Sequence, residues 1–208
     1  MSNNKLAALT FDDGPNTVTT PQVLDVLEQN GIPASFFVVG NNITPESSEV
    51  MRRAVKLGCE IENHSRTHSD MSKMSAEEML AEINFTSDAV ENAVGRRPKF
   101  FRPPYISYNQ LMFDTIDPTF ICGVGADDWN DEVSADERFN RIMEQVSDGA
   151  IILLHDMTGN FRTVEAIGRI IPAMKSEGYE FVTVSELFSR KNIVPRKTSI
   201  YTNVFQEW

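Results

Sequence analysis

The sequence has little positive charge and no long hydrophobic run. Its 208 residues include 19 Lys and Arg against 30 Asp and Glu, which gives a formal net charge of -11. Nucleic acids and anionic membrane surfaces are bound through basic patches, so we expect neither as a partner. No apolar run approaches the roughly 20 residues that a helix needs to cross a bilayer.

Cysteine is scarce, and the first residues are mostly polar. The two cysteines, Cys59 and Cys122, each lie in an apolar, strand-like stretch, which favours buried thiols over a disulfide. Residues Met1–Lys5 lead into the first apolar strand without a hydrophobic signal core. The sequence as given is typical of an unexported protein, but a catalytic module cut from a secreted enzyme would look the same. Localisation therefore stays open.

The chain is long enough for one sizeable core. Its 41% hydrophobic content, over a length typical of a single α/β barrel, predicts one domain over residues 1–208. No internal repeat or low-complexity tract divides it. The motifs described below lie within residues 6–188, whereas the tail, residues 189–208, carries no motif that we can assign.

Seven strand-like runs alternate with mostly helical segments. Capping boxes at Ser75 and Ser134 mark two of the helix starts. The alternation favours parallel pairing with right-handed crossovers, and hence a (β/α) barrel or an open doubly wound sheet. The expected strands are Leu6–Phe11, Ala34–Val39, Cys59–Asn63, Phe100–Arg102, Thr119–Val124, Ala150–Leu154 and Glu180–Val184.

The three histidines, His64, His68 and His155, all lie inside short polar motifs. His64 and His68 are four residues apart, which on one face of a helical turn would let both imidazoles reach a common ion. His155 ends an almost wholly apolar strand, where it could protonate a leaving group. Taken alone, His64 and His68 could be ordinary surface histidines, and His155 could be a structural residue at a strand end. A catalytic role therefore depends on the other polar groups around them.

Two adjacent carboxylates, Asp12 and Asp13, end the first strand. An Asp-Asp-Gly-Pro sequence is by itself an ordinary solvated turn. Because neighbouring strand residues point to opposite sides, one carboxylate can ligate a metal while the other accepts a proton from water. Two imidazoles and one carboxylate match three-ligand catalytic zinc sites, and they also suit cobalt or nickel. We predict a metallohydrolase with one divalent ion. Zinc is the first candidate for this ion, and cobalt and nickel are the alternatives.

Further polar groups follow the fourth and fifth strands. Arg102 could clamp Asp12, and a carboxylate of Asp127-Asp128 could orient His155. In a parallel barrel the carboxyl ends of the strands meet at one face, where barrel enzymes have their active sites. Taken singly, Arg102 could instead pair with any acidic side chain, and Trp129 could belong to the core.

In order and spacing, five motifs resemble those of the polysaccharide deacetylase (NodB-homology) family, carbohydrate esterase family four. The resemblance spans residues 6 to about 188 and implies an α/β fold, the family's distorted (β/α) barrel of about seven parallel strands. Residues 100–104, 111–117 and 125–130 look most like clostridial-type acetylxylan esterases. The five motifs are Thr10–Pro15, His64–His68, Arg102–Tyr105, Asp128–Trp129 and Leu153–His155.

The resemblance implies a role for each site residue. Asp12 would be the catalytic base, held by Arg102, and His155 would be the catalytic acid, tuned by Asp128. The implied metal ligands are Asp13, His64 and His68.

Three further residues would contact the acetyl group. The backbone N–H of Tyr105 would help to bind the oxyanion, while Trp129 and Leu153 would shape the acetyl pocket.

The activity that the resemblance implies is metal-dependent removal of acetyl groups from a polysaccharide or oligosaccharide, without a covalent acyl-enzyme. The resemblance to clostridial-type enzymes implies an acetylxylan esterase, and the acidic charge of the chain suits a neutral polymer better than an anionic cell-wall polymer. The main alternative is N-deacetylation of chitooligosaccharides or of peptidoglycan N-acetylglucosamine. A small-amide hydrolase and a non-catalytic carbohydrate-binding relative are two others. The sequence does not define the oligomeric state.

Overall fold

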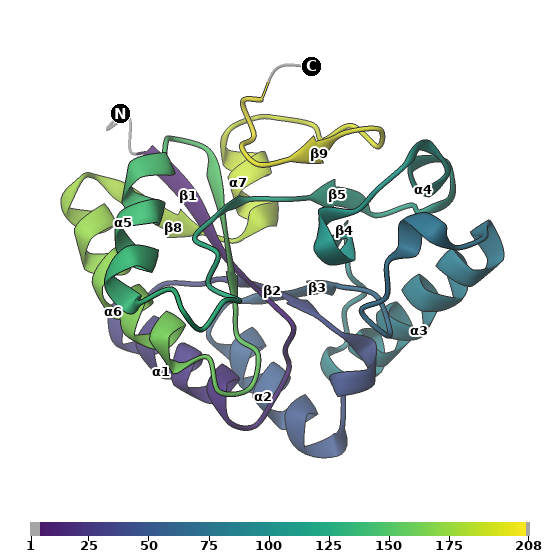
Figure 1. Ribbon diagram of the computed structural model, residues 1–208, viewed down its shortest axis with the longest axis horizontal. Coiled ribbons are helices and arrows are strands. Elements are labelled where there is room, and N and C mark those ends of the chain that lie inside the picture. The colour runs from purple at the N-terminus through teal and green to yellow at the C-terminus, as the bar shows by residue number, and fades with distance from the viewer. Residues whose placement is uncertain (1–4, 207–208) are drawn as a thin grey trace.

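The computed structural model describes residues 5–206, in which nine short strands form one curled sheet with helices on its outside (Figure 1). Every pair of neighbouring strands in this sheet is parallel. The predicted α/β fold, a distorted parallel barrel, is confirmed. The strands are β1 (Lys5–Asp12), β2 (Ser35–Val38), β3 (Glu60–Asn63), β4 (Phe100–Phe101), β5 (Thr119–Ile121), β6 (Val124–Gly125), β7 (Ala150–His155), β8 (Tyr179–Val182) and β9 (Ile200–Tyr201).

The helices follow the strands along the chain and begin with ordinary cap chemistry. The predicted capping boxes at Ser75 and Ser134 are both formed, and Thr44 and Thr183 make two more. Among residues 5–206, no helix combines the length and the apolar character that a membrane span requires. The helices are α1 (Thr19–Asn30), α2 (Pro45–Lys56), α3 (Ala76–Val94), α4 (Gln110–Thr115), α5 (Ala135–Gln145), α6 (Phe161–Ser176) and α7 (Val184–Arg190), with short 3-10 turns η1 (Gly40–Asn42), η2 (Met71–Lys73) and η3 (Pro104–Ile106).

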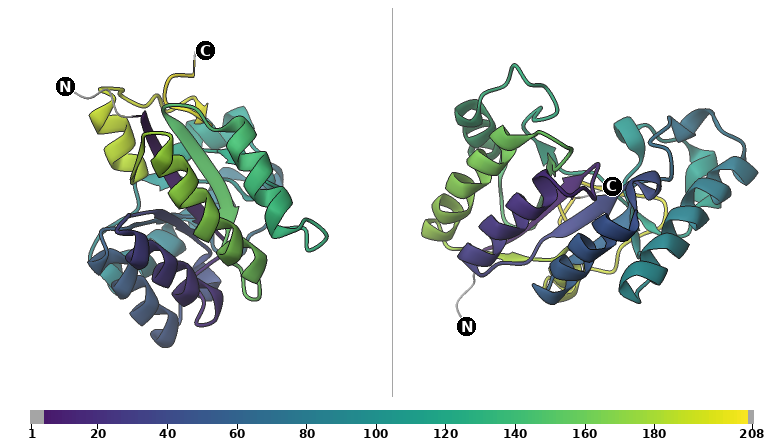
Figure 2. Two further views of the ribbon diagram at one scale, coloured as in Figure 1. Left: turned by 90° about the vertical axis from the view of Figure 1, so that its left-hand side faces the viewer. Right: turned by 90° about the horizontal axis from the view of Figure 1, so that it is seen from below.

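Strand β1 is the centre of the sheet. It pairs with β7 along one side, and on the other side with β8 through its first half and with β2 through its second half. Its alternate residues are buried on both faces, since Leu6 and Ala8 belong to one core cluster and Leu9 and Phe11 to another. On the outer side, α5 and α6 lie next to each other over β1 and β7 (Figure 2).

The strand expected over Thr119–Val124 is divided in two. Cys122 donates its N–H to the carbonyl of Tyr201, and after Gly123 the chain joins β7 as β6. The change of partner needs a close approach at Gly123, where an added Cβ would lie 2.7 Å from the Cβ of Leu153. Cys122 is partly buried, Cys59 is buried and both thiols are free, as predicted.

The C-terminal tail takes part in the sheet, for which the sequence gives no signal. Strand β9 pairs with β5, and the next residues reach β7, where Ile151 donates its N–H to Thr202 and Val204 donates to Gly149. Tyr201 and Val204 pack in the same cluster as Leu6. The tail therefore connects β5 to the amino-terminal half of β7, while β6 covers the carboxyl-terminal half.

Candidate active site

The predicted site residues gather at the carboxyl ends of the strands, around a cavity of about 480 Å³. They reach it from the last residues of β1 and β7 and from the loops that follow β1, β3, β4 and β6. This is the position that a parallel barrel dictates for polar groups after its strands. The cavity is lined by Asp12, Asp13, His64, His68, Pro103, Tyr105, Ile106, Trp129, Leu153 and His155.

Three of these side chains lie close enough together to hold one metal ion. The Nε2 atoms of His64 and His68 lie 3.5 and 3.4 Å from Oδ1 of Asp13. One ligand atom from each residue can be chosen so that all three lie within 4.8 Å of one another. This nitrogen and oxygen donor set fits a divalent ion of the zinc, cobalt or nickel type.

The tautomer of His64 also suits metal binding. Its Nδ1 lies 2.7 Å from the carbonyl oxygen of Arg102, which can only accept a hydrogen bond. Nδ1 therefore carries the proton, and Nε2 presents its lone pair towards Asp13. Burial lowers the pKa of His64 and outweighs the nearby charges of Asp12 and Asp13, which raise it. The neutral imidazole is the form that binds metals.

The two metal-site histidines do not lie on a helical turn, so that part of the prediction is wrong. Residues 64–70 form a loop, in which Ser65 and His68 have positive φ angles of 64° and 59°. The side chain of Asn63 fixes this loop: it donates to Ile83 of α3 and accepts the N–H of Ser65. Asn63 was not among the predicted site residues, although it directly precedes the motif.

The turn that carries Asp13 is attached to the end of β7 by Asp156. Asp13 has a φ angle of 75°, a left-handed conformation that non-glycine residues rarely adopt. The buried carboxylate of Asp156 accepts the N–H of Gly14 at 3.1 Å, and its own N–H donates to the carbonyl of Asp12. A Cβ at Gly14 would lie 2.6 Å from that carboxylate. Only glycine therefore fits at this point of the turn.

Asp156 was not among the predicted site residues, although it directly follows His155. Its carboxylate also accepts a hydrogen bond of 2.5 Å from Thr20. Burial, with a smaller effect of the nearby Asp13 and Asp12 charges, raises the pKa of Asp156 to about 7. Asp156 thus serves the turn as a buried hydrogen-bond acceptor.

Asp12 and Arg102 form a buried ion pair. Asp12 is only 2% exposed, and its Oδ1 accepts a hydrogen bond of 2.5 Å from Arg102 Nη1. The fully buried guanidinium also donates to Thr10 and to the carbonyl of Cys122, and it lies 4.1 Å from the centre of the Phe37 ring. These contacts fix the orientation of Arg102 and keep a positive charge against Asp12. The predicted contact between Arg102 and Asp12 is present.

His155 is paired with Asp128. Its Nδ1 lies 2.8 Å from one carboxylate oxygen of Asp128, and its backbone N–H donates to the other, also at 2.8 Å. Burial alone would lower the pKa of His155, but the hydrogen bond and charge of Asp128, with the charges of Asp12 and Asp13, raise it to about 9. His155 is therefore held as a proton donor at neutral pH.

A polar network supports Asp128 from behind. Thr163 donates to Asp128 at 2.7 Å, and Asn160 donates to its carbonyl. The fully buried Arg138 donates in turn to Asn160 and Thr163. Asp12 thus has a buried arginine, Arg102, in direct contact. Asp128 has the buried Arg138 one residue further away, behind Asn160 and Thr163. No motif signalled Arg138, because its partners come from α6 and the loop before it.

Two exposed aromatic side chains form the rim of the cavity. Tyr105 is 70% exposed and Trp129 is 60% exposed, so Trp129 is not a core residue. The Tyr105 ring stands edge-on to His68 at 4.8 Å, and Tyr105 has a φ angle of 59°. Leu153 lies beside them as a partly buried apolar wall. The rim can therefore receive a small apolar group next to the metal-binding side chains.

The cavity holds a group that could bind a metal, Asp13, His64 and His68, beside the pairs Asp12–Arg102 and Asp128–His155. This arrangement fits a hydrolase site of the carbohydrate esterase type. The chain belongs to the polysaccharide deacetylase family, whose family model matches residues 2–117. The family resemblance seen in the sequence is thereby confirmed.

Two relatives and two solved structures illustrate the match. A bifunctional xylanase/deacetylase of Pseudobutyrivibrio xylanivorans is 48% identical over 97% of this chain and 34% of its own length. The peptidoglycan-N-acetylmuramic acid deacetylase PdaC of Bacillus subtilis is 39% identical over 89% of this chain and 39% of its own length. The chain therefore spans little more than a third of these relatives.

The structural matches extend over the whole fold. The Xyl-CE4 domain of a multidomain xylanase from the hindgut metagenome of Trinervitermes trinervoides has a TM-score of 0.95 and 47% identity, covering 97% of this chain and 98% of that one. A family 4 acetyl xylan esterase from Clostridium thermocellum, solved with a cobalt ion, has a TM-score of 0.94 and 40% identity, covering 97% and 100%.

Proposed function

We propose that residues 1–208 form a single catalytic domain that removes O-acetyl groups from xylan by metal-dependent hydrolysis. The observation that carries this proposal is the arrangement within one cavity of a clamped carboxylate, Asp12, a protonated imidazole, His155, and the Asp13–His64–His68 triad. Base, acid and metal-binding side chains are the three components that acetyl hydrolysis by direct attack of water requires.

Asp13, His64 and His68 are the residues that would hold the metal, with zinc proposed first and cobalt or nickel as alternatives. When bound, such an ion polarises the acetyl carbonyl and lowers the pKa of water.

Asp12 acts as the general base and accepts a proton from the attacking water. Arg102 pairs with the carboxylate of Asp12 and fixes its orientation through the 2.5 Å contact. His155 then donates its Nε2 proton to the sugar oxygen as the bond between that oxygen and the acetyl carbon breaks, which yields acetate and a free hydroxyl. Asp128 keeps His155 charged and oriented for this step.

Three residues position the acetyl group. The backbone N–H of Tyr105 stabilises the oxyanion that forms on the carbonyl oxygen. Trp129 and Leu153 provide apolar contact for the methyl group, since both line the cavity close to His155.

Xylan is supported as the substrate by two matches, the xylanase/deacetylase and the family 4 acetyl xylan esterase. The net charge of -11 also suits a neutral polymer better than an anionic one. The 39% identical peptidoglycan deacetylase supports N-deacetylation of an amino sugar polymer as the second candidate.

Acetate release from matched substrates tests the choice between these functions. Metal-loaded protein is incubated with acetylated xylo-oligosaccharides, N-acetylated chitooligosaccharides or peptidoglycan fragments, and acetate is quantified. The proposal predicts a higher kcat/KM for the xylo-oligosaccharides than for either N-acetylated substrate. Preference for an N-acetylated substrate would make the protein an N-deacetylase, and no release from any substrate would contradict a catalytic function.

A further inference from the structure

The segment that follows β2, residues 39–42, lies between the two loops that carry the metal-binding side chains. Strand β2 pairs with β1 on one side and with β3 on the other. Asp13 directly follows β1, whereas His64 and His68 lie in the loop after β3. None of the residues that line the catalytic cavity comes from residues 39–42. The segment is therefore placed to act on the metal-binding loops without itself contacting the ion.

The backbone of this segment binds both loops. On one side, Val39 donates its N–H to the carbonyl of Gly14 at 2.8 Å, and Gly14 directly follows Asp13. On the other side, Gly40 donates its N–H to the carbonyl of Ser65 at 2.9 Å, and Ser65 directly follows the first histidine. The bonding between neighbouring strands thus continues past the ends of β1, β2 and β3, up to the residues next to the metal-binding side chains.

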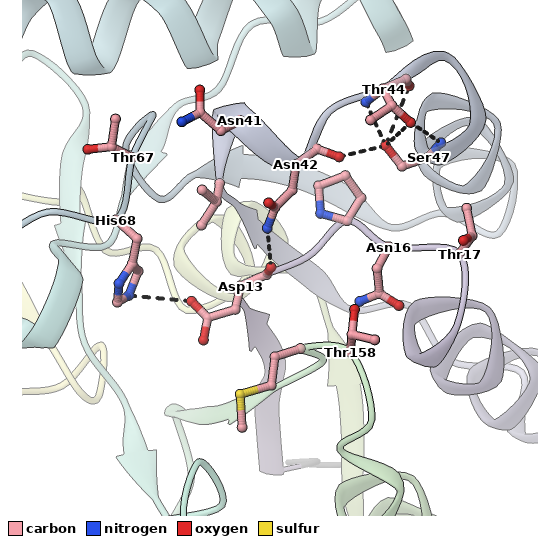
Figure 3. Close-up of a pocket in the computed structure, with 13 residues that line it drawn as sticks. Asp13, Asn16, Thr17, Asn41, Asn42, Thr44, Ser47, Thr67, His68 and Thr158 are labelled. Carbon is pink, nitrogen blue, oxygen red and sulfur yellow. Dashed lines mark hydrogen bonds and ion pairs between the residues drawn. The ribbon is translucent and has the colours of Figure 1, made fainter.

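Asn42 adds a side-chain bond to the turn of Asp13. Its Nδ2 donates to the carbonyl oxygen of Asp13 at 2.8 Å. Figure 3 shows that this bond is made to the main chain of Asp13, while the carboxylate points towards His68. The carbonyl of Asn42 in turn accepts the hydroxyl of Ser47 in α2 at 2.8 Å. The donor is therefore anchored to a helix and aimed at the metal-binding turn.

The metal-binding loops contain unfavourable backbone conformations. Asp13, Ser65 and His68 have φ angles of 75°, 64° and 59°, in the left-handed region where a residue with a side chain is strained. Such residues keep this conformation only when the surrounding structure holds them. A turn that is loose before an ion arrives must be ordered when the ion binds, and the cost of this ordering weakens the affinity. A hydrogen bond that holds the turn beforehand therefore strengthens metal binding.

We propose that Asn42 is a positioning residue for the metal ligand Asp13. By holding the carbonyl of Asp13, it keeps the turn in the conformation that directs the carboxylate towards the imidazoles of His64 and His68. This role rests on the proposed function, because it takes these three residues as the metal ligands. Asn42 does not line the catalytic cavity, so its contribution reaches the ion only through Asp13.

The variant Asn42→Ala tests this role, because it removes the donor at an exposed position that needs no packing. The readout is zinc affinity, measured by competition with a chelator in the absence of any substrate. We expect the affinity to be about 5-fold weaker than in the wild type, as for the loss of one neutral hydrogen bond. Asn42→Leu, which keeps a side chain of similar size without the N–H, should show the same loss.

Asn41→Ala is the matched control. Asn41 is the adjacent and equally exposed asparagine, and the side-chain hydrogen bond described for it is accepted from the exposed side chain of Arg66. Its removal should leave zinc affinity at the wild-type level. Circular dichroism checks that every variant is folded. A general loss of stability that leaves the protein folded would not change zinc affinity, so the readout is specific for the metal site.

His68→Ala, measured beside these variants, separates the possible failures. Its zinc affinity should fall by at least about 10-fold, because a ligand is lost. If His68→Ala weakened binding while Asn42→Ala equalled the Asn41→Ala control, the positioning role would be overturned and the proposed metal site would stand. If none of the variants changed zinc affinity, the proposed metal site would fail and the positioning role with it.

Discussion

Replacement of Asp128 by asparagine should move the alkaline limit of activity to lower pH. The pKa of His155 is raised from 6.5 to about 9, and Asp128 is the strongest of the groups that raise it. Burial, the largest single effect, lowers this pKa. Without the Asp128 charge we therefore expect a value of about 6.5 or below.

The size of the effect follows from the protonated fraction of His155. The catalytic acid is active when protonated, so activity is present below the pKa and is lost as the pH rises through it. At about pH 8, a group with a pKa of about 9 is roughly 90% protonated, whereas one with a pKa of about 6.5 is roughly 3% protonated. The variant should therefore retain about one thirtieth of the wild-type kcat at that pH, with a smaller deficit in more acidic solution.

The assay is the pH profile of kcat for acetylated xylo-oligosaccharides, with metal-loaded protein and with folding checked by circular dichroism. Asp127→Asn is the matched control, because Asp127 is the adjacent aspartate but is exposed and pairs with Arg141. Its profile should coincide with that of the wild type. An unchanged alkaline limb in folded Asp128→Asn protein would refute the assignment of His155 as an acid tuned by Asp128.

Three further changes test other parts of the site. Asp12→Asn should lower kcat by about 100- to 10,000-fold, as expected for loss of a general base. The amount of bound metal, measured by elemental analysis, should stay at the wild-type level. Near-normal turnover would rule out Asp12 as the general base. His68→Ala should weaken zinc affinity by at least about 10-fold in a competition titration with a chelator, because one of three ligands is lost, and unchanged affinity would exclude His68 as a ligand. Arg138→Met should lower the free energy of unfolding in urea by about 3 kcal/mol, because it removes the buried donor to Asn160 and Thr163. A loss no larger than that of the partly exposed control Arg141→Met would show that the network is not important for stability.

The parts of the fold that depend on local periodicity could be predicted from the sequence. Apolar runs and cap residues located the long strand β1 and the helices that begin after Ser75 and Ser134. The division of the strand expected over Thr119–Val124 could not be predicted, because it depends on a tertiary contact between Gly123 and Leu153. The role of β9 was missed for the same reason, since two residues that pair across the barrel leave no periodic pattern.

The candidate site could be assembled from motifs because its side chains follow the strands directly. The contact of Arg102 with Asp12 and that of Asp128 with His155 are both present. The local conformation was the weaker part of the prediction: His64 and His68 converge through a loop with positive φ angles rather than through a helical turn.

Most of the residues that support the site could not be predicted from the sequence. Asn63, Asp156 and Arg138 act through hydrogen bonds to groups far away in the chain, which no spacing rule describes. Asn63 and Asp156 adjoin predicted histidines, so attention to the polar neighbours of a motif could have found these two. Arg138 has no such neighbour.

The proposed metal dependence is tested most directly by acetate release from acetylated xylo-oligosaccharides by chelator-stripped protein during titration with zinc. A single ion held by Asp13, His64 and His68 predicts negligible release at the start, and activity that rises to a plateau at one zinc ion per chain. The His68→Ala protein should need a higher zinc concentration to reach its own plateau. Full activity of the stripped protein, or a plateau that requires more than one ion per chain, would contradict a single metal ion held by Asp13, His64 and His68.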